Sequence, residues 1–369
     1  MKVTIRTAVL LLLLAVLISC QGASLKDIIK GIESPSPTHV YAAGYSNNSS
    51  NVQFAGYWKD GTWVGLANPY GSYGAQVNSL VVSGSNVYAG GYSANTSSVG
   101  VAGYWLNGSW NGLSNPYGSS YSAEVYSLVV SGSDMYAGGC SYNSSGVQIP
   151  GYWKDGTWVG LVNPYGSYYN ACVYSLAVSG SDVYAGGGSA NLSGVWIPGY
   201  WWDGGWVGLT NPGGSSYTAG VLSLVVSGSD VYAAGLCMSS SVTLAGYWKD
   251  GTWVGLPNPY GSSYAAGVNS LVVAGSNVYV GGYCSNGSVI VGGYWKDGTW
   301  VGLPNPYGSS YGSWVLSLAV SGSDVYAGGY CTNSSVTLAG YWKDGTWVLL
   351  ANPYGWYDAM VYSLVLASQ

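Results

Sequence analysis

Between residue 39 and its end, the chain alternates short apolar, β-branched runs with turns rich in Gly, Ser, Asn and Asp. One unit shows the pattern, with apolar runs over residues 125–130, 134–139, 147–153 and 157–161. The first and third gaps are tight Gly-Ser and Asp-Gly turns, and Asp-Gly suits the positive φ angles of a two-residue hairpin. No later segment has the 3.6-residue period of an amphipathic helix. The pattern therefore predicts four short strands per unit.

The unit is repeated seven times. A Tyr-Trp pair recurs every 47 or 48 residues, and a second Trp follows five positions after each first one. The Trp residues of the seven pairs are Trp58, Trp105, Trp153, Trp201, Trp248, Trp295 and Trp342. Four-stranded units of 40–50 residues are typical of a β-propeller. The copies fill residues 39–369, so we predict one propeller domain there.

The phase of the repeat favours a closed ring. The first copy begins at its second strand, near Val40, whereas the chain ends on a first strand at residues 361–366. Pairing the two would complete one blade and cover an exposed sheet edge. We therefore predict an all-β fold: a seven-bladed β-propeller with four antiparallel strands per blade, closed by pairing of the C-terminal strand with the N-terminal blade. An open solenoid would leave the split copy unexplained.

Each copy also resembles a Kelch repeat, in which a strand ends in Gly-Gly and is followed by a Tyr and then a Trp. One copy has Gly138-Gly139, Tyr152 and Trp158, and the resemblance covers all seven copies. In two copies the Gly pair is weakened, to Ala42-Ala43-Gly44 and Ala233-Ala234-Gly235. The resemblance implies a Kelch-like propeller. Glycines would permit close strand packing near the inner edge, while the aromatic residues fill the wider outer part of each blade.

The N-terminus reads as an export signal. Lys2 and Arg6 precede an apolar run, residues 8–18, that is too short to span a bilayer, so we predict a signal peptide at 1–19. Its end, Leu17-Ile18-Ser19-Cys20, resembles the lipobox of bacterial lipoproteins. That resemblance implies lipidation of Cys20, a tether over 20–38, and attachment to a membrane of the cell envelope, with the outer membrane or cell surface favoured. The alternative is an ordinary secretory signal with an incidental cysteine.

Composition excludes several functions. Charged residues are 6% of the chain, and its nine Lys and Arg include Lys2 and Arg6, leaving seven Lys against 14 acidic residues. This balance cannot supply the basic surface that nucleic-acid binding needs. One histidine, His39, cannot form a multi-histidine metal site, and no cofactor motif is present. We predict no catalytic residues, no metal and no cofactor.

Loop lengths separate the two faces of the predicted ring. Turns after the first and third strands are short and carry most of the charge, whereas the loops after the second and fourth strands are longer. Because recognition usually resides on loops held by a rigid scaffold, we predict binding on the face with the long loops. Its repeated tyrosines include Tyr117, Tyr165, Tyr260 and Tyr307. Alternatively, these tyrosines pack against neighbouring loops and only pave the ring.

A variable position lies just before each predicted first strand. Its occupants are Gln76, Glu124, Cys172, Gly220, Gly267, Trp314 and Met360. The first strand should be innermost, so this set would surround the mouth of the central channel and could form one asymmetric site. Gln76, Glu124 and Trp314 are our candidates, together with Asp358; drift at an unconstrained position is the alternative explanation.

These observations favour a monomeric, non-catalytic module that binds a protein or a glycan. A hydrolase at the channel mouth is the alternative, although Glu124 and Asp358 fall on non-adjacent blades, too far apart for a paired-carboxylate mechanism. Three of the five cysteines after Cys20 occupy equivalent positions, which should lie too far apart for disulfides. We expect all five to be small buried residues: Cys140, Cys172, Cys237, Cys284 and Cys331.

Overall fold

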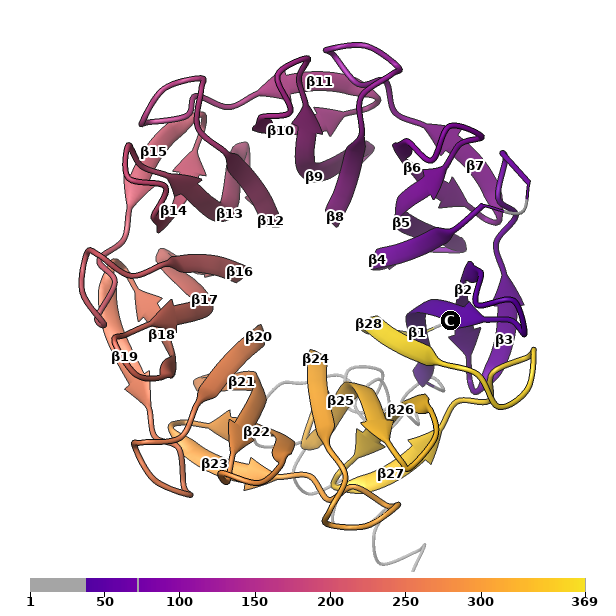
Figure 1. Ribbon diagram of the computed structural model, residues 1–369, viewed down its shortest axis with the longest axis vertical. Helices are drawn as coiled ribbons and strands as arrows, with labels where there is room; N and C mark the ends of the chain where they lie inside the picture. Colours follow the sequence, from indigo (N-terminus) through magenta and orange to yellow (C-terminus); the bar gives the residue numbers. More distant parts are fainter. Residues whose placement is uncertain (1–37, 72, 369) are drawn as a thin grey trace, which may run out of the picture. The chain divides into compact units, whose positions relative to one another are not determined.

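The computed structural model describes residues 38–71 and 73–368, and every regular element in these ranges is a β-strand. The 28 strands form seven four-stranded antiparallel sheets arranged in a ring (Figure 1). This confirms the predicted seven-bladed β-propeller. Residues His39–Ala367 form its compact unit. The predicted signal peptide, Cys20 and the tether lie outside the described residues, apart from Thr38, which begins β1.

The strands of each blade follow, in order from the inside of the ring to the outside. The first blade comprises β28 (Ala359–Ser368), β1 (Thr38–Asn47), β2 (Gln53–Lys59) and β3 (Thr62–Gly65). The second comprises β4 (Ala75–Ser83), β5 (Asn86–Ala94), β6 (Gly100–Leu106) and β7 (Ser109–Gly112). The third comprises β8 (Ala123–Ser131), β9 (Asp134–Tyr142), β10 (Gln148–Lys154) and β11 (Thr157–Gly160). The fourth comprises β12 (Ala171–Ser179), β13 (Asp182–Ala190), β14 (Trp196–Trp202) and β15 (Gly205–Gly208).

The remaining three blades have the same order. The fifth comprises β16 (Ala219–Ser227), β17 (Asp230–Met238), β18 (Thr243–Lys249) and β19 (Thr252–Leu256). The sixth comprises β20 (Ala266–Ala274), β21 (Asn277–Ser285), β22 (Ile290–Lys296) and β23 (Thr299–Gly302). The seventh comprises β24 (Ser313–Ser321), β25 (Asp324–Thr332), β26 (Thr337–Lys343) and β27 (Thr346–Leu349). Among the described residues, no helix is long and apolar enough to cross a membrane.

The first and last strands close the ring as predicted, because β28 pairs with β1 in the first blade. A repeated hydrogen bond between adjacent inner strands also occurs at the point where the ring closes. The amide of Leu128 donates to the hydroxyl of Ser79 in the preceding blade, at 2.9 Å. The same bond joins Leu80 to Ser363 across the closure, at 3.0 Å. Each of the seven blades makes this contact with its neighbour, so the inner circuit is complete.

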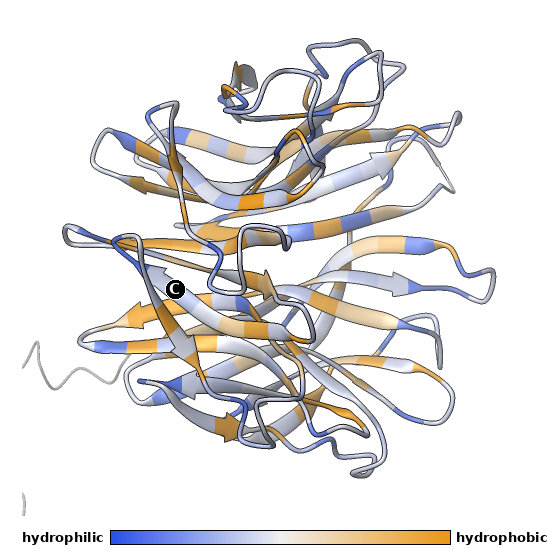
Figure 2. Ribbon diagram, turned by 60° about the vertical axis from the view of Figure 1, so that its left-hand side comes forward, coloured by the Kyte–Doolittle hydropathy of each residue, from blue (hydrophilic) through white to orange (hydrophobic). Residues whose placement is uncertain are grey.

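The Trp of each Tyr-Trp pair forms the core between blades. Trp153 is fully buried, lies 4.6 Å from the ring of Trp158, and donates its indole N–H to the carbonyl of Ser114 in the preceding blade. All seven copies repeat this bond, at 2.8–3.0 Å. Figure 2 shows hydrophobic residues along the strands and hydrophilic residues at the turns and loops. Because each of these Trp side chains packs between its own blade and the preceding one, the repeated sequence specifies the contacts that hold neighbouring blades together.

The Gly pair sits where the backbone is most crowded. A Cβ on Gly139 would lie 1.9 Å from the carbonyl oxygen of Glu124 on the adjacent strand, and one on Gly138 would lie 2.6 Å from Leu176 of the next blade. A larger residue at Gly139 would require a backbone shift, whereas one at Gly138 would require the Leu176 side chain to move, and two copies carry Ala at that position, Ala43 and Ala234. The expected role of these glycines in close packing at the inner edge is therefore confirmed.

The hairpin turns behave as their sequences predict. Asp155 and Gly156 both have positive φ, 48° and 83°. The carboxylate of Asp155 also accepts the amide N–H of Met135. Such turns, with those after the inner strands, form what we call the short-turn face. The longer loops, residues 95–99 and 113–122 in the second blade, form the long-loop face.

Candidate functional site

The variable position lies within the inner strand, not before it as the sequence suggested. Glu124 is the second residue of β8 and pairs with Cys140 of β9. The inner strand starts two residues earlier than predicted because pairing continues past a β-bulge at Tyr126. We call the seven variable residues, at the long-loop end of the inner strands, the rim positions.

The bulged residues of the inner strands form a second set of positions whose residue type differs among the blades. In six inner strands the register shifts at one residue, which is therefore unpaired with the neighbouring strand. A bulge bends the strand and re-aims that side chain, as often happens beside functional sites. The bulged residues are Asn78, Tyr126, Tyr174, Leu222, Asn269 and Leu316. Two positions, separated by one constant Val, thus vary along an otherwise repetitive strand.

Two of the candidates, Gln76 and Glu124, occupy rim positions on adjacent blades and contact bulged residues. The amide of Gln76 donates to the side-chain oxygen of Asn78 at 2.5 Å. The hydroxyl of Tyr126 donates to the Glu124 carboxylate, also at 2.5 Å, and the Tyr126 and Tyr174 rings are 5.3 Å apart. This side of the rim is polar and rich in phenols.

The rim phenols stay protonated at neutral pH. Burial, followed by the charge of Glu124 and the hydrogen bond to it, holds the pKa of Tyr126 far above its usual value. Burial and the neighbouring Tyr142 and Glu124 raise the pKa of Tyr174 to about 12. Burial and then Glu124 also raise the pKa of Tyr92. These tyrosines can therefore donate and accept hydrogen bonds, but they are not bases.

Trp314 occupies the rim position of the seventh blade, where its ring stacks on Tyr330 at 4.8 Å. In the sixth blade Gly267 leaves room for Tyr283, whose ring occupies the space that a Cβ would take. Aromatic side chains therefore dominate this part of the rim. Trp314 presents a rigid aromatic surface held by its stacking partner.

A pocket of about 320 Å³ opens where the rim position is Gly220. A Cβ on Gly220 would meet nothing within 4 Å. The walls come from the fourth, fifth and sixth blades, and Thr218 and Thr243 add hydroxyls to a mostly apolar lining. The principal lining side chains are Tyr174, Trp196, Leu222, Leu236, Met238 and Tyr283. Among the pockets, this one combines rim and bulge residues.

Sequence reasoning missed most of these pocket residues. Trp196 begins β14, a position that Gln, Gly, Thr or Ile occupies in the other copies. Its ring lies over Gly188, within 2.9 Å of where a Cβ would be. Leu236 likewise stands where several copies have Tyr. Departure from the repeat at these positions was the available signal, but only the fold shows that they meet.

Two further grooves recur at an equivalent place beneath the long loops of the second and seventh blades, with volumes of about 400 and 240 Å³. Their walls are the start of the third strand and the loop that follows the fourth. They arise from the repeat geometry. The Gly220 pocket, in contrast, depends on residues that differ from the repeat.

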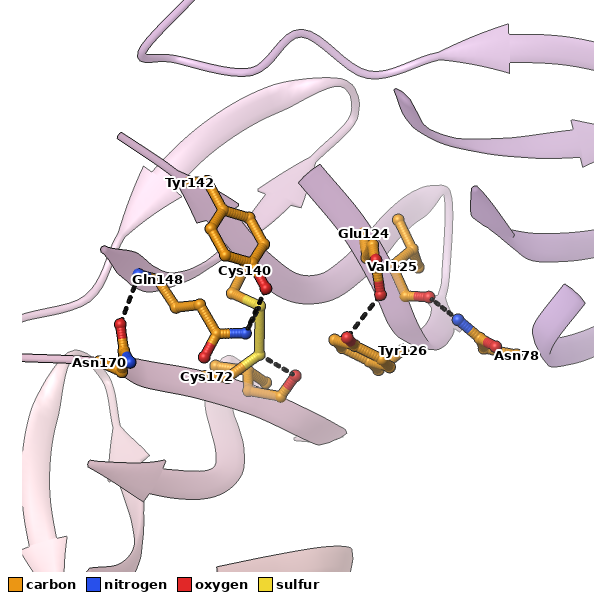
Figure 3. The surroundings of a disulfide bond; sticks show 10 residues. Asn78, Glu124, Val125, Tyr126, Cys140, Tyr142, Gln148, Asn170 and Cys172 are labelled. Atoms are coloured by element: carbon orange, nitrogen blue, oxygen red, sulfur yellow. Dashed lines mark hydrogen bonds between the residues drawn. A yellow bond between two sulfur atoms is a disulfide. The ribbon is translucent and has the colours of Figure 1, made fainter. Parts of the chain in front are cut away.

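The cysteine prediction is wrong for one pair, because Cys140 and Cys172 form a disulfide with a Cα–Cα distance of 5.1 Å (Figure 3). Cys140 lies on β9 and Cys172 on β12 of the next blade. These positions are not equivalent, and neighbouring blades approach closely near the axis. A 32-residue separation corresponds to roughly 3–4 kcal/mol of stabilisation in the chain-entropy treatment.

The other three cysteines match the prediction of small buried residues. Cys237, Cys284 and Cys331 are free and fully buried. Burial raises the pKa of the Cys237 and Cys284 thiols to about 12 and also raises that of Cys331. As protonated thiols they are poor nucleophiles.

The long loops hold their tyrosines through repeated asparagines. Asn115 accepts the amide N–H of Tyr117 and donates to the carbonyls of Tyr121 and Ser122. Equivalent asparagines do the same elsewhere, so their side chains are committed to loop structure. Tyr117 and Tyr260 are exposed, whereas Tyr165 and Tyr307 are half-buried. Tyr307 lies against Trp347, so packing accounts for part of this ring.

Asp358 precedes β28, on a blade separated from that of Glu124 by the second blade. Its carboxylate accepts the amide N–H of Thr337 at 2.7 Å. It therefore does not join Glu124 in a two-carboxylate site. Of the predicted site residues, Gln76 and Glu124 lie at rim positions of neighbouring blades, and Trp314 lies at the rim position of the seventh blade. Asp358 and the four loop tyrosines are not rim residues.

His39 and most charges lie on the short-turn face. The imidazole of His39 is 2.5 Å from the Asp60 carboxylate in the β2–β3 turn. Lys154 pairs with Asp134 at 2.7 Å and sits over the ring of Tyr136. In the described part of the chain, no three His, Cys, Asp or Glu residues gather as potential metal ligands.

Comparison with known proteins identifies the fold class. No protein-family model matches the chain, and no curated protein sequence does. It resembles the β-propeller domain of the Trilobed protease from Pyrococcus furiosus, with a TM-score of 0.51 and 10% identity over 86% of this chain and 95% of that one. This likeness is one of fold alone.

Other solved structures are similar at lower scores. A putative 6-phosphogluconolactonase from Bacteroides uniformis has a TM-score of 0.44 and 14% identity, over 89% of this chain and 99% of that one. A mutant of the Aleuria aurantia lectin in complex with alpha-methyl-L-fucoside has a TM-score of 0.39 and 12% identity, over 75% of this chain and 96% of that one. Function must therefore be argued from the rim itself.

Proposed function

We propose that this chain is a bacterial envelope lipoprotein with Kelch-like repeats, anchored through lipid on Cys20. Its propeller would be a non-catalytic module that binds a glycan at the rim. The lipobox-like segment supports the anchor. The Cys140–Cys172 disulfide supports a location outside the reducing cytosol, where disulfides persist. The low charge of the long-loop face favours an uncharged or weakly charged ligand.

The observation that carries the proposal is the Gly220 pocket. Its volume of about 320 Å³ falls within the usual range for small-ligand sites, roughly 300–1,000 Å³. It is the place where three blades contribute residues that depart from the repeat. A single ligand subsite on a symmetric scaffold requires such a local departure.

A sugar fits the chemistry of this pocket. The apolar face of a sugar ring packs its C–H groups against an aromatic face, whose quadrupole is negative. Trp196, Tyr174 and Tyr283 offer aromatic surfaces, and Thr218 and Thr243 offer hydroxyls. The side chains of the loop asparagines already hold their own loops through hydrogen bonds. These contacts support the pocket as the proposed glycan site.

The pocket can be tested by filling it. Gly220→Val places a side chain in open space, so we expect the fold to be kept while glycan binding falls at least about tenfold, as a clash in a snug pocket would produce. Glycan-array screening followed by calorimetry on the best ligand measures this. Trp202→Ala is the matched control, since Trp202 is on the short-turn face and stacks on Tyr184. If the Gly220→Val variant bound the glycan as tightly as the wild type, the pocket would be excluded as the glycan site. If no glycan bound and an envelope protein were captured instead, the result would favour a protein-binding module.

The anchor gives a separate prediction. Cys20→Ala removes the thiol that lipidation needs, so we expect the protein to leave the membrane fraction and lose labelled palmitate, because stable anchoring depends on more than one acyl chain. Fractionation of the native host with metabolic labelling measures both. A Cys237→Ala variant should keep its lipid. If the Cys20 variant stayed membrane-bound and processed, the lipoprotein assignment would be wrong.

A further inference from the structure

Glu124 differs from every other acidic side chain in residues 38–71 and 73–368 in what it contacts. The others each receive a nitrogen donor. Some pair with Lys or His, as Asp134 does with Lys154, and others accept a backbone amide or an indole N–H. Glu124 accepts only the phenol of Tyr126. Within these residues, no cation therefore compensates its negative charge.

No lysine in the described residues supplies that cation. The five described lysines all end third strands at the short-turn face, where each sits over a tyrosine ring. Glu124 is near the opposite end of β8, beside the long loops. Its neighbours are aromatic instead. The Tyr126 ring lies 5.3 Å from that of Tyr174, and burial together with the charge of Glu124 raises the pKa of the nearby Tyr92.

This combination suits an organic cation. A carboxylate attracts a protonated amine directly, and aromatic faces attract it through their quadrupole, more strongly when the site is partly desolvated. Figure 3 shows Glu124 and Tyr126 side by side on β8. Among the described residues Glu124 has no ion-pair partner, so one ammonium group would balance its charge.

The site borders the pocket described above through one shared residue. Tyr174 packs against Tyr126 and also lines the Gly220 pocket, so a single side chain forms the shared wall. A ligand in the pocket can extend past Tyr174 toward Glu124. We propose that the rim binds an amino sugar with a free, protonated amine, and this inference rests on the proposed glycan function. Glu124 would bind the ammonium group together with Tyr126 and Tyr174.

The experiment compares two trisaccharides that differ only at nitrogen: the β-1,4 glucosamine trimer and its fully N-acetylated form. At about pH 6, where primary amines are protonated, we expect the wild-type protein to bind the amine form about tenfold more tightly. Glu124→Gln should lose this preference and retain the weaker binding of the acetylated form. Asp358→Asn, which alters the other carboxylate of the long-loop face, should keep the preference.

The outcomes separate the two proposals. Equal binding of both trimers by the wild type, a preference that survives Glu124→Gln, or binding of neither trimer would each overturn the amino-sugar inference. The proposed function survives those results if another glycan binds and Gly220→Val weakens it. Failure of every glycan on the array overturns the proposed function itself. Unchanged unfolding midpoints for the variants show that the changes act on binding.

Discussion

Trp153→Ala should lower the free energy of unfolding by about 3–5 kcal/mol, the usual cost of removing a buried tryptophan. Loss of its hydrogen bond to the Ser114 carbonyl adds roughly 1 kcal/mol. The side chain is fully buried, and its contacts join the third blade to the second, so the cavity opens between blades. Urea unfolding followed by circular dichroism measures the change.

Trp356→Ala is the matched control, since this side chain is 71% exposed. We expect its effect to stay within about 0.5 kcal/mol, as for most surface substitutions. Comparable losses in both variants would show that the Tyr-Trp tryptophans are not the packing element between blades. Trp248→Ala, in the fifth blade, should behave like Trp153→Ala, because its indole makes the equivalent bond to Thr210.

Ending the chain at Asp358 should have the larger effect, because it removes β28. Val361 and Leu364 are buried, and together they contribute about 3–6 kcal/mol. The ladder with β1 and the bond from Leu80 to Ser363 are also lost. Domain stabilities are typically about 5–15 kcal/mol, so we expect little folded monomer and aggregation through the exposed β1 edge.

Size-exclusion chromatography and circular dichroism of the truncated protein measure this outcome. A peptide of residues 359–368 should restore the fold by adding the missing strand. The same peptide with Val361→Asp and Leu364→Asp should not. A truncated chain that unfolds at the wild-type midpoint, without the peptide, would contradict the closed ring.

The repeated parts of the fold were predictable because each copy carries the same local instructions. Asp155-Gly156 specifies its hairpin through backbone angles that few other residue pairs adopt easily. A Tyr-Trp pair, Tyr152-Trp153 in the third blade, marks the third strand of each copy. Closure followed from the split first copy. The start of the inner strand was wrong by two residues, because pairing continues past the bulge at Tyr126 to Ala123 and Glu124, which lie outside the apolar run that predicted the boundary.

The candidate site was predictable only in part. The variable set containing Gln76, Glu124 and Trp314 stood out because those residues differ among copies. Trp196 and Leu236 differ too, but they lie on other strands, and their meeting at Gly220 depends on how three blades pack. Asp358 carries the right charge for a ligand contact, yet its carboxylate already accepts the Thr337 amide.

Local chemistry and periodicity were thus enough to establish seven four-stranded blades and the face on which the long loops emerge. These local signals act over a few residues at a time and recur in every copy. They could not predict the contacts between blades, since those contacts join residues far apart in the chain and depend on distance from the axis. The Cys140–Cys172 disulfide, the separation of Glu124 from the described lysines and the pocket at Gly220 all depend on the packing of neighbouring blades, which brings non-equivalent strands together.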